Sequence, residues 1–229
     1  MLFTLLAAAP AIALAWVAAI LAALTVHEFS HALMAKFRGD RTAEWEGRLT
    51  LNPLSHIDPI GFLSLLLVGF GWAKPVPYNP NNLKDAKWDQ VAVALMGPVS
   101  NLILATVAAL VLRLLVWSGI VSSLNLLVIF LFLLVFINLG LAFFNFIPVH
   151  PLDGSKMFFV LFNHPKHFEL RRIVGTYGSQ ILMALVVLSL VTPFNPFFFV
   201  DIPTQAACDF LLSEDCRGFF GAMLSAVSR

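Results

Sequence analysis

Residues 11–37 read AIALAWVAAILAALTVHEFSHALMAKF. Together with the residues before them they form an apolar run over about 2–37, interrupted at Pro10. About 20 apolar residues cross a hydrocarbon core of about 30 Å, so this run predicts a membrane-spanning helix. No Lys or Arg precedes Lys36. The run therefore lacks the basic region of a secretory signal, and we expect it to remain in the protein.

The composition of the whole chain agrees with a membrane protein. Of its 229 residues, 59% are apolar and only 12% are charged. Soluble domains have about 45–50% apolar residues and about 25% charged residues. The mean hydropathy is +0.87. The formal charge of +1 provides no basic field, which excludes nucleic acid as a partner.

Three later segments are also long and apolar enough to span, at 91–117, 124–147 and 177–200. We expect Pro193 and Pro196 to break or end the last of them. Residues 60–72 are apolar but short, and they contain Gly61, Gly69 and Gly71. The predicted fold class is therefore an all-α polytopic membrane protein, with about four long transmembrane helices, a short re-entrant or tilted element and a small β-like loop.

The basic residues predict the orientation in a cell membrane, because cytoplasmic loops are enriched in Lys and Arg. If 60–72 is re-entrant, eleven of the 14 basic residues fall on one side. These are Lys36, Arg38, Arg41, Arg48, Lys74, Lys84, Lys87, Lys156, Lys166, Arg171 and Arg172. We assign that side to the cytoplasm, with the N-terminus outside. Residues 1–200 then form the membrane domain, and 201–229 form a short extracytoplasmic tail that can be amphipathic.

Both cysteines, Cys208 and Cys216, lie in this tail. Their spacing is not CxxC, and no histidine lies near them, which argues against a zinc knuckle or a redox motif. In an oxidising outer compartment they can form a disulfide. We state this bond as a hypothesis.

The strongest chemical signal is the HExxH motif of His27, Glu28 and His31. Helical positions four apart share a face, so the two histidines can bind one metal ion. Glu28 is placed to accept a proton from a metal-bound water. The alternative is a helix end at which these side chains are merely solvated. The membrane context favours the metal site, because ionisable groups at that depth are costly and usually functional.

A catalytic zinc ion takes three protein ligands and leaves one position open. The third candidate is Asp153, in the segment NFIPVHPLDG at 145–154. The two prolines and the glycine predict that the helix unwinds there. Irregular backbone at membrane depth requires protein or a water-filled cavity around it, and such a break can direct Asp153 into the bundle. Alone, the segment would equally fit a Pro-Gly turn at the membrane surface.

These two motifs together resemble the site-2 protease family of intramembrane zinc metalloproteases. The second motif matches the family's N-x-x-P-x-x-P-x-D-G at every position. Three further stretches are similar to the family or to its compact bacterial and archaeal branch without a PDZ domain. They are Gly97 to Asn101, the segment 47–59 with His56 and Asp58, and Gly71 to Pro77. The resemblance extends over about 20–160.

The resemblance implies one Zn²⁺ per chain, held by His27, His31 and Asp153, with Glu28 as the general base. It implies an intramembrane endopeptidase that cuts a peptide bond in or near a transmembrane segment of a membrane protein. Asn145 would bind the unwound substrate or its oxyanion. The active site would lie near the cytoplasmic side, where water can enter. Residues 50–78 would supply an edge for strand pairing and a gate.

Other polar residues are more ambiguous. His56 either contributes to substrate binding or fixes its loop, and His150 is either a partner of the site or an interfacial residue. Arg113 lies four residues before Trp117, and we expect it to snorkel to the outer interface. Two other classes of protein remain open: a cation transporter or channel that uses the same His, Glu and Asp cluster, and an inactive scaffold. The intact Glu28 argues against the scaffold. The sequence does not predict an oligomeric state.

Overall fold

The computed structural model describes residues 9–119, 121–122 and 125–227, and this part of the chain is helical without a β-strand. Four helices are long and apolar enough to cross a membrane. They are α2 (Pro10–Phe37), α5 (Trp88–Trp117), α6 (Leu126–Asn145) and α8 (Phe168–Val191). The shorter helices are α3 (Thr42–Trp45), α4 (Pro59–Val68), α7 (Asp153–Leu161), α9 (Phe198–Leu212) and α10 (Cys216–Val227). The predicted fold class is confirmed.

The observed helix ends differ from the predicted ones. Pro10 begins α2, as expected for a residue that lacks an N–H and fits the first helical turn. The fourth span was predicted over 177–200, but α8 begins at Phe168 and ends at Val191. Thr192 is extended, as expected before Pro193, and Val200 belongs to α9. Residues 2–8 and 124 of the predicted spans lie outside the described residues.

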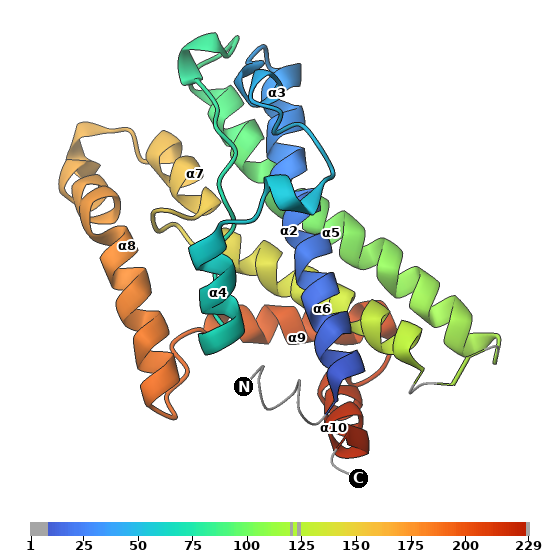
Figure 1. Ribbon diagram of the computed structural model, residues 1–229. Helices are drawn as coiled ribbons and strands as arrows, with labels where there is room; N and C mark the ends of the chain where they lie inside the picture. The colour runs from blue at the N-terminus through green and yellow to red at the C-terminus, as the bar shows by residue number, and fades with distance from the viewer. Residues whose placement is uncertain (1–8, 120, 123–124, 228–229) are drawn as a thin grey trace.

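The centre of the bundle consists of α2, α5 and α6 (Figure 1). The first two helices face one another with small buried residues, including Ala19 and Ala23 of α2 and Ala105 and Ala109 of α5. Small residues allow backbones to approach closely in a membrane. Helix α6 fills the remaining space with larger side chains, including the fully buried Phe132. In contrast, α8 stands to one side and buries only Gly178, Leu182 and Val186.

Helix α4 has the short re-entrant character predicted for 60–72. Its N-terminus is capped by Asp58 Oδ1, which accepts from the N–H of Gly61 at 2.8 Å. It ends after 10 residues at Gly69, which has φ of +85°. An isolated antiparallel bridge then pairs Ile57 with Ala73. The segment therefore returns to the residues at which it started.

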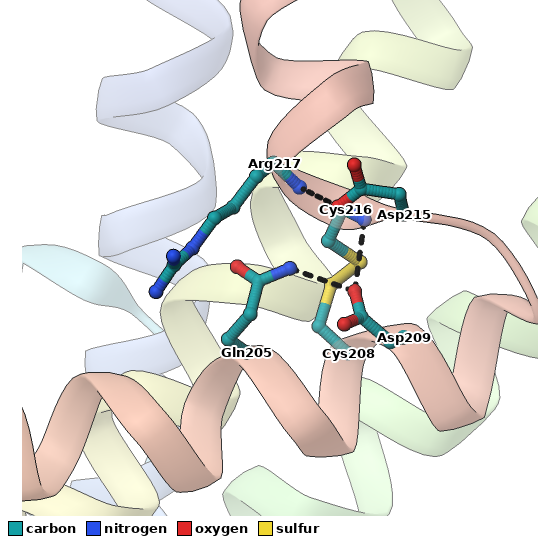
Figure 2. The surroundings of a disulfide bond; sticks show 6 residues. All are labelled: Gln205, Cys208, Asp209, Asp215, Cys216 and Arg217. Atoms are coloured by element: carbon teal, nitrogen blue, oxygen red, sulfur yellow. Dashed lines mark hydrogen bonds between the residues drawn. A yellow bond between two sulfur atoms is a disulfide. The ribbon is translucent and has the colours of Figure 1, made fainter.

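The C-terminal helices α9 and α10 close the end of the bundle at which α2 begins (Figure 1). Helix α9 packs against α6, and Cys208 forms the expected disulfide with Cys216 at the start of α10 (Figure 2). Both cysteines are fully buried. Asp209 Oδ1 reinforces the corner by accepting from the N–H of Cys216 at 2.9 Å. Beyond the disulfide, the Phe219 ring lies 4.5 Å from that of Phe132, between centroids.

Candidate active site

The two HExxH histidines share the face of α2 that is directed toward α5. Both are buried, and their Nε2 atoms lie 3.0 Å apart. This arrangement confirms that the motif lies on one continuous helix and brings the two imidazoles together.

The break after α6 brings the third predicted ligand to the same point. Helix α6 ends at Asn145, and Asp153 begins α7. The turn between them requires Gly154, because a Cβ atom there would lie 2.5 Å from the carbonyl oxygens of Phe146 and Ile147. Asp153 Oδ2 lies 3.1 Å from Nε2 of both His27 and His31.

The outer nitrogens of both rings are engaged by α5. His27 Nδ1 lies 2.6 Å from Asn101 Oδ1, and His31 Nδ1 lies 2.7 Å from the carbonyl oxygen of Val93. Asn101 Nδ2 donates to Asn138 Oδ1 of α6 at 2.7 Å, which fixes the orientation of the amide. Because both partners of the rings are acceptors, each neutral imidazole carries its proton on Nδ1.

The inner faces of these residues therefore present three lone pairs to one another. The Nε2 atoms are unprotonated in these neutral rings, and the Asp153 carboxylate is an acceptor. Three such atoms at 3.0–3.1 Å repel one another unless a cation lies among them. Ligand atoms of a tetrahedral ion bound at about 2.0–2.1 Å are about 3.3 Å apart. The donor set and its spacing thus fit a divalent metal ion, and two nitrogens with one oxygen suit zinc.

Helix α5 provides the surface on which the two rings rest. A Cβ atom on Gly97 would lie 2.5 Å from Cε1 of His31 and 2.6 Å from Cε1 of His27. A residue with a side chain would therefore displace both imidazoles. Gly97 and Asn101 share a helix face four residues apart, so one face of α5 supplies both the close approach and the hydrogen bond to His27.

Glu28 lies next to the cluster and is held by the segment that follows α4. We call residues 73–79 the strap. The N–H of Val76 donates to Glu28 Oε2 at 3.0 Å. Near one end of the strap, the N–H of Lys74 donates to the His56 carbonyl at 2.9 Å. At its other end, the N–H of Asn79 donates to Asp40 Oδ2 at 2.6 Å. The strap is thus fixed at both ends, with its centre bonded to the predicted base.

Asp40 is the buried anchor of the strap. It also accepts from both the N–H and the hydroxyl of Thr42 and from the amide of Asn82. Burial raises the pKa of the Asp40 carboxyl, but these hydrogen bonds and the one from Asn79 lower it more, so its pKa lies below the ordinary value. Asp40 is therefore ionised at neutral pH.

The other predicted residues lie outside the metal cluster. His56 Nε2 donates to the Thr50 carbonyl at 2.8 Å, an interaction that fixes its loop, and His56 also lines an apolar cavity of about 570 Å³. Asn145 Nδ2 donates within its own helix, to the Leu141 carbonyl at 3.0 Å. Arg113 is exposed as expected and donates to the Leu211 carbonyl of α9 at 3.3 Å.

Several site residues were given no role from the sequence. Asn101 and Gly97 lie in a stretch that resembled the family, but neither had an assigned contact. Asn138 carried a usable signal, because it is an amide within a strongly apolar span. The Val93 carbonyl carried none, because a backbone acceptor has no signature in the residue that provides it.

Comparison with known proteins agrees with this site. The family model of peptidase family M50 matches residues 118–189, which include the Asn145–Gly154 motif and Asp153. "Putative zinc metalloprotease YwhC" of Bacillus subtilis is 40% identical over 141 residues, or 60% of this chain. "Putative zinc metalloprotease Rip2" of Mycolicibacterium smegmatis is 29% identical over 191 residues, which cover 78% of this chain and 68% of that protein.

The match spans 64% of the length of the Bacillus protein. No solved structure matches the chain significantly. The matched family segment supplies Asp153, and the site geometry joins this residue to the HExxH helix. Over the matched segment the chain is similar to peptidase family M50, the site-2 protease family.

Proposed function

We propose that the chain is an intramembrane zinc metalloendopeptidase that cleaves a peptide bond in or near a transmembrane segment of another membrane protein. One observation carries the proposal: three potential ligand atoms, from His27, His31 and Asp153, converge at 3.0–3.1 Å from one another. None of the relatives reported above is named as a transporter.

His27, His31 and Asp153 would hold one zinc ion per chain. When bound, zinc supplies Lewis acidity, which polarises a carbonyl and lowers the pKa of water. The hydrogen bonds from the two Nδ1 atoms orient the rings toward this point. Glu28 accepts the proton of the attacking water and passes it to the leaving amine. The N–H of Val76 holds Glu28 in place for this transfer.

The substrate must unwind, because the carbonyls of a transmembrane helix are already hydrogen-bonded. We assign the strap as the edge on which the unwound segment pairs, since it is not helical, runs past Glu28 and is fixed at both ends. Asn145 lies at the end of α6, within the break that leads to Asp153, and we assign it to the bound segment.

We further propose that the active site faces the cytoplasm and that both termini face outward. Two observations support this orientation. The start of α2 and helix α10, which carries Cys216 of the disulfide, lie at one end of the bundle, whereas α3 lies at the opposite end (Figure 1). Buried disulfides persist in oxidising compartments, and basic residues gather in the loops around α3 and the strap.

The test is cleavage of single-span substrates by the purified, reconstituted protein. Glu28→Gln should retain zinc and lose cleavage, because it removes the base and keeps the ligands. Asp153→Ala should lose both zinc and cleavage. His164→Gln serves as a control, since His164 only caps a short surface turn. Cleavage that survives in both site variants and in chelator would refute the proposal.

A further inference from the structure

The two oxygens of Asp153 have different partners. Oδ2 lies 3.1 Å from both histidine Nε2 atoms, whereas Oδ1 lies 3.2 Å from Nζ of Lys156, one turn further along α7. The Asp153 side chain is 9% exposed and that of Lys156 is 30% exposed. The pair thus joins a buried carboxylate to a partly exposed cation, which engages the oxygen that does not face the two histidines.

Lys156 has a second contact, with the strap. Its Nζ lies 5.2 Å from the centroid of the Tyr78 ring, within the range of a cation–π interaction. Tyr78 belongs to the strap and lies two residues after Val76, whose N–H is bonded to Glu28. A single side chain therefore contacts both a metal ligand and the segment that holds the base.

We propose that Lys156 is a positioning residue that couples Asp153 to the strap. This inference rests on the proposed function and adds a specific role to it. The ammonium group holds Oδ1, so that Asp153 offers the single oxygen Oδ2 to the metal. Through the Tyr78 ring, the same group keeps the strap at the distance from Asp153 that a bound substrate segment requires. Lys156 touches neither the metal nor the reacting atoms.

A simple helical ion pair at i and i+3 is the competing explanation. Such pairs contribute little when both partners are solvated. The Asp153 carboxylate is not solvated, and its removal from water must be compensated by its partners. Partners that orient a metal ligand typically affect metal affinity or activity by about 10–100-fold. The competing explanation predicts no change in zinc affinity when Lys156 is replaced.

The first measurement is zinc affinity, by competition with a chromophoric chelator, in the Glu28→Gln background so that it does not depend on cleavage. Lys156→Met should weaken zinc binding by about 10–100-fold, and Lys156→Arg should restore most of it. Tyr78→Leu should bind zinc as the parent does, because Lys156 still holds Asp153. Thermal melting and size exclusion of each protein establish that it is folded.

The second measurement is the affinity of the same proteins for a fluorescent single-span peptide. Tyr78→Leu should weaken peptide binding several-fold, whereas Tyr78→Phe, which keeps the ring face, should not. Adding Tyr78→Leu to Lys156→Met should cause little further loss. Zinc binding at the parental level in Lys156→Met, or peptide binding at the parental level in Tyr78→Leu, would overturn the inference. Neither result would affect the proposed function, which is tested by wild-type cleavage.

Discussion

Gly97 lies directly beneath the imidazole of His31, and a Cβ atom at Gly97 would lie 2.5 Å from Cε1 of that ring. The backbone of α5 is therefore part of the candidate metal site. Gly97→Ala should displace both histidine rings, because His27 is equally close. Since a 1 Å displacement of a site can cost about 100-fold in rate, we expect cleavage to fall by about that factor and zinc content to fall below one per chain.

Gly140→Ala is the matched control for this substitution. Gly140 lies inside α6, and a Cβ atom there would meet no atom within 4 Å. Alanine favours a helix interior by about 1 kcal/mol relative to glycine. The backbone effect of Gly97→Ala or Gly140→Ala should therefore not lower the stability of the protein. Zinc content by elemental analysis should separate them. Equal zinc content and equal cleavage in the two variants would mean that the rings can rearrange.

Asn101 should be required for metal affinity although it does not contact the metal. Its side-chain oxygen accepts from His27 Nδ1 and thereby fixes the ring with Nε2 unprotonated. Asn101→Leu removes this acceptor and should weaken zinc binding by about 10–100-fold. Asn101→Asp keeps an acceptor and should bind zinc more tightly than the leucine variant. Competition with a chelator measures the zinc affinity of both variants. If the leucine variant bound zinc as tightly as the aspartate variant, the hydrogen bond to His27 would have no role in metal affinity.

The sequence predicted those parts of the site that depend on local pattern. The spacing of His27 and His31 placed both rings on one face, and the prolines around Asp153 predicted the helix break that brings it inward. The partners of the rings depend on packing between helices, which a pattern along one helix does not encode. The Val93 carbonyl is one such partner. The end of α8 was missed because Val200 is as apolar as a membrane residue, although it begins a separate helix.

The hydrogen bond between the strap and Glu28 predicts a substitution that impairs the base without impairing zinc binding. Val76→Pro removes the N–H that donates to Glu28. Val76 lies between Pro75 and Pro77, and the residue before a proline is already restricted to extended conformations. We therefore expect the strap to keep its shape, zinc to bind as in the wild type, and kcat to fall by about tenfold or more, as expected for a base that is no longer oriented.

Val76→Ala is the control, since it shortens the side chain and keeps the N–H. It should cleave a reconstituted substrate at nearly the wild-type rate. If the alanine and proline variants lost activity equally, the side chain of Val76 would be responsible, and the hydrogen bond to Glu28 would have no role in orientation.

Asp40 predicts a dependence of stability on pH. Its folded pKa lies below the ordinary value of about 3.9. A carboxyl group whose pKa is depressed in the folded state stabilises the fold. This stabilisation is complete at a pH above the unfolded-state pKa and is lost as the pH falls through the folded-state pKa. Asp40→Asn should thus be less stable than the wild type at pH 7, by about 2 kcal/mol for hydrogen bonds to a charged group. The difference in melting temperature should shrink below about pH 4, and a constant difference down to pH 3 would contradict the assignment.

The disulfide predicts a loss of stability at the end of the bundle away from the metal. Cys208 and Cys216 are eight residues apart in sequence. Closing a loop of that length lowers the chain entropy of the unfolded state and so raises its free energy by about 2.5 kcal/mol at 25 °C. Replacing both with serine should lower the melting temperature in detergent, and reductant should lower that of the wild type but not of the variant. Zinc content should be unchanged, because the ligands lie on α2 and α7. A loss of zinc in the double variant would show that the C-terminal helices and the metal site are coupled.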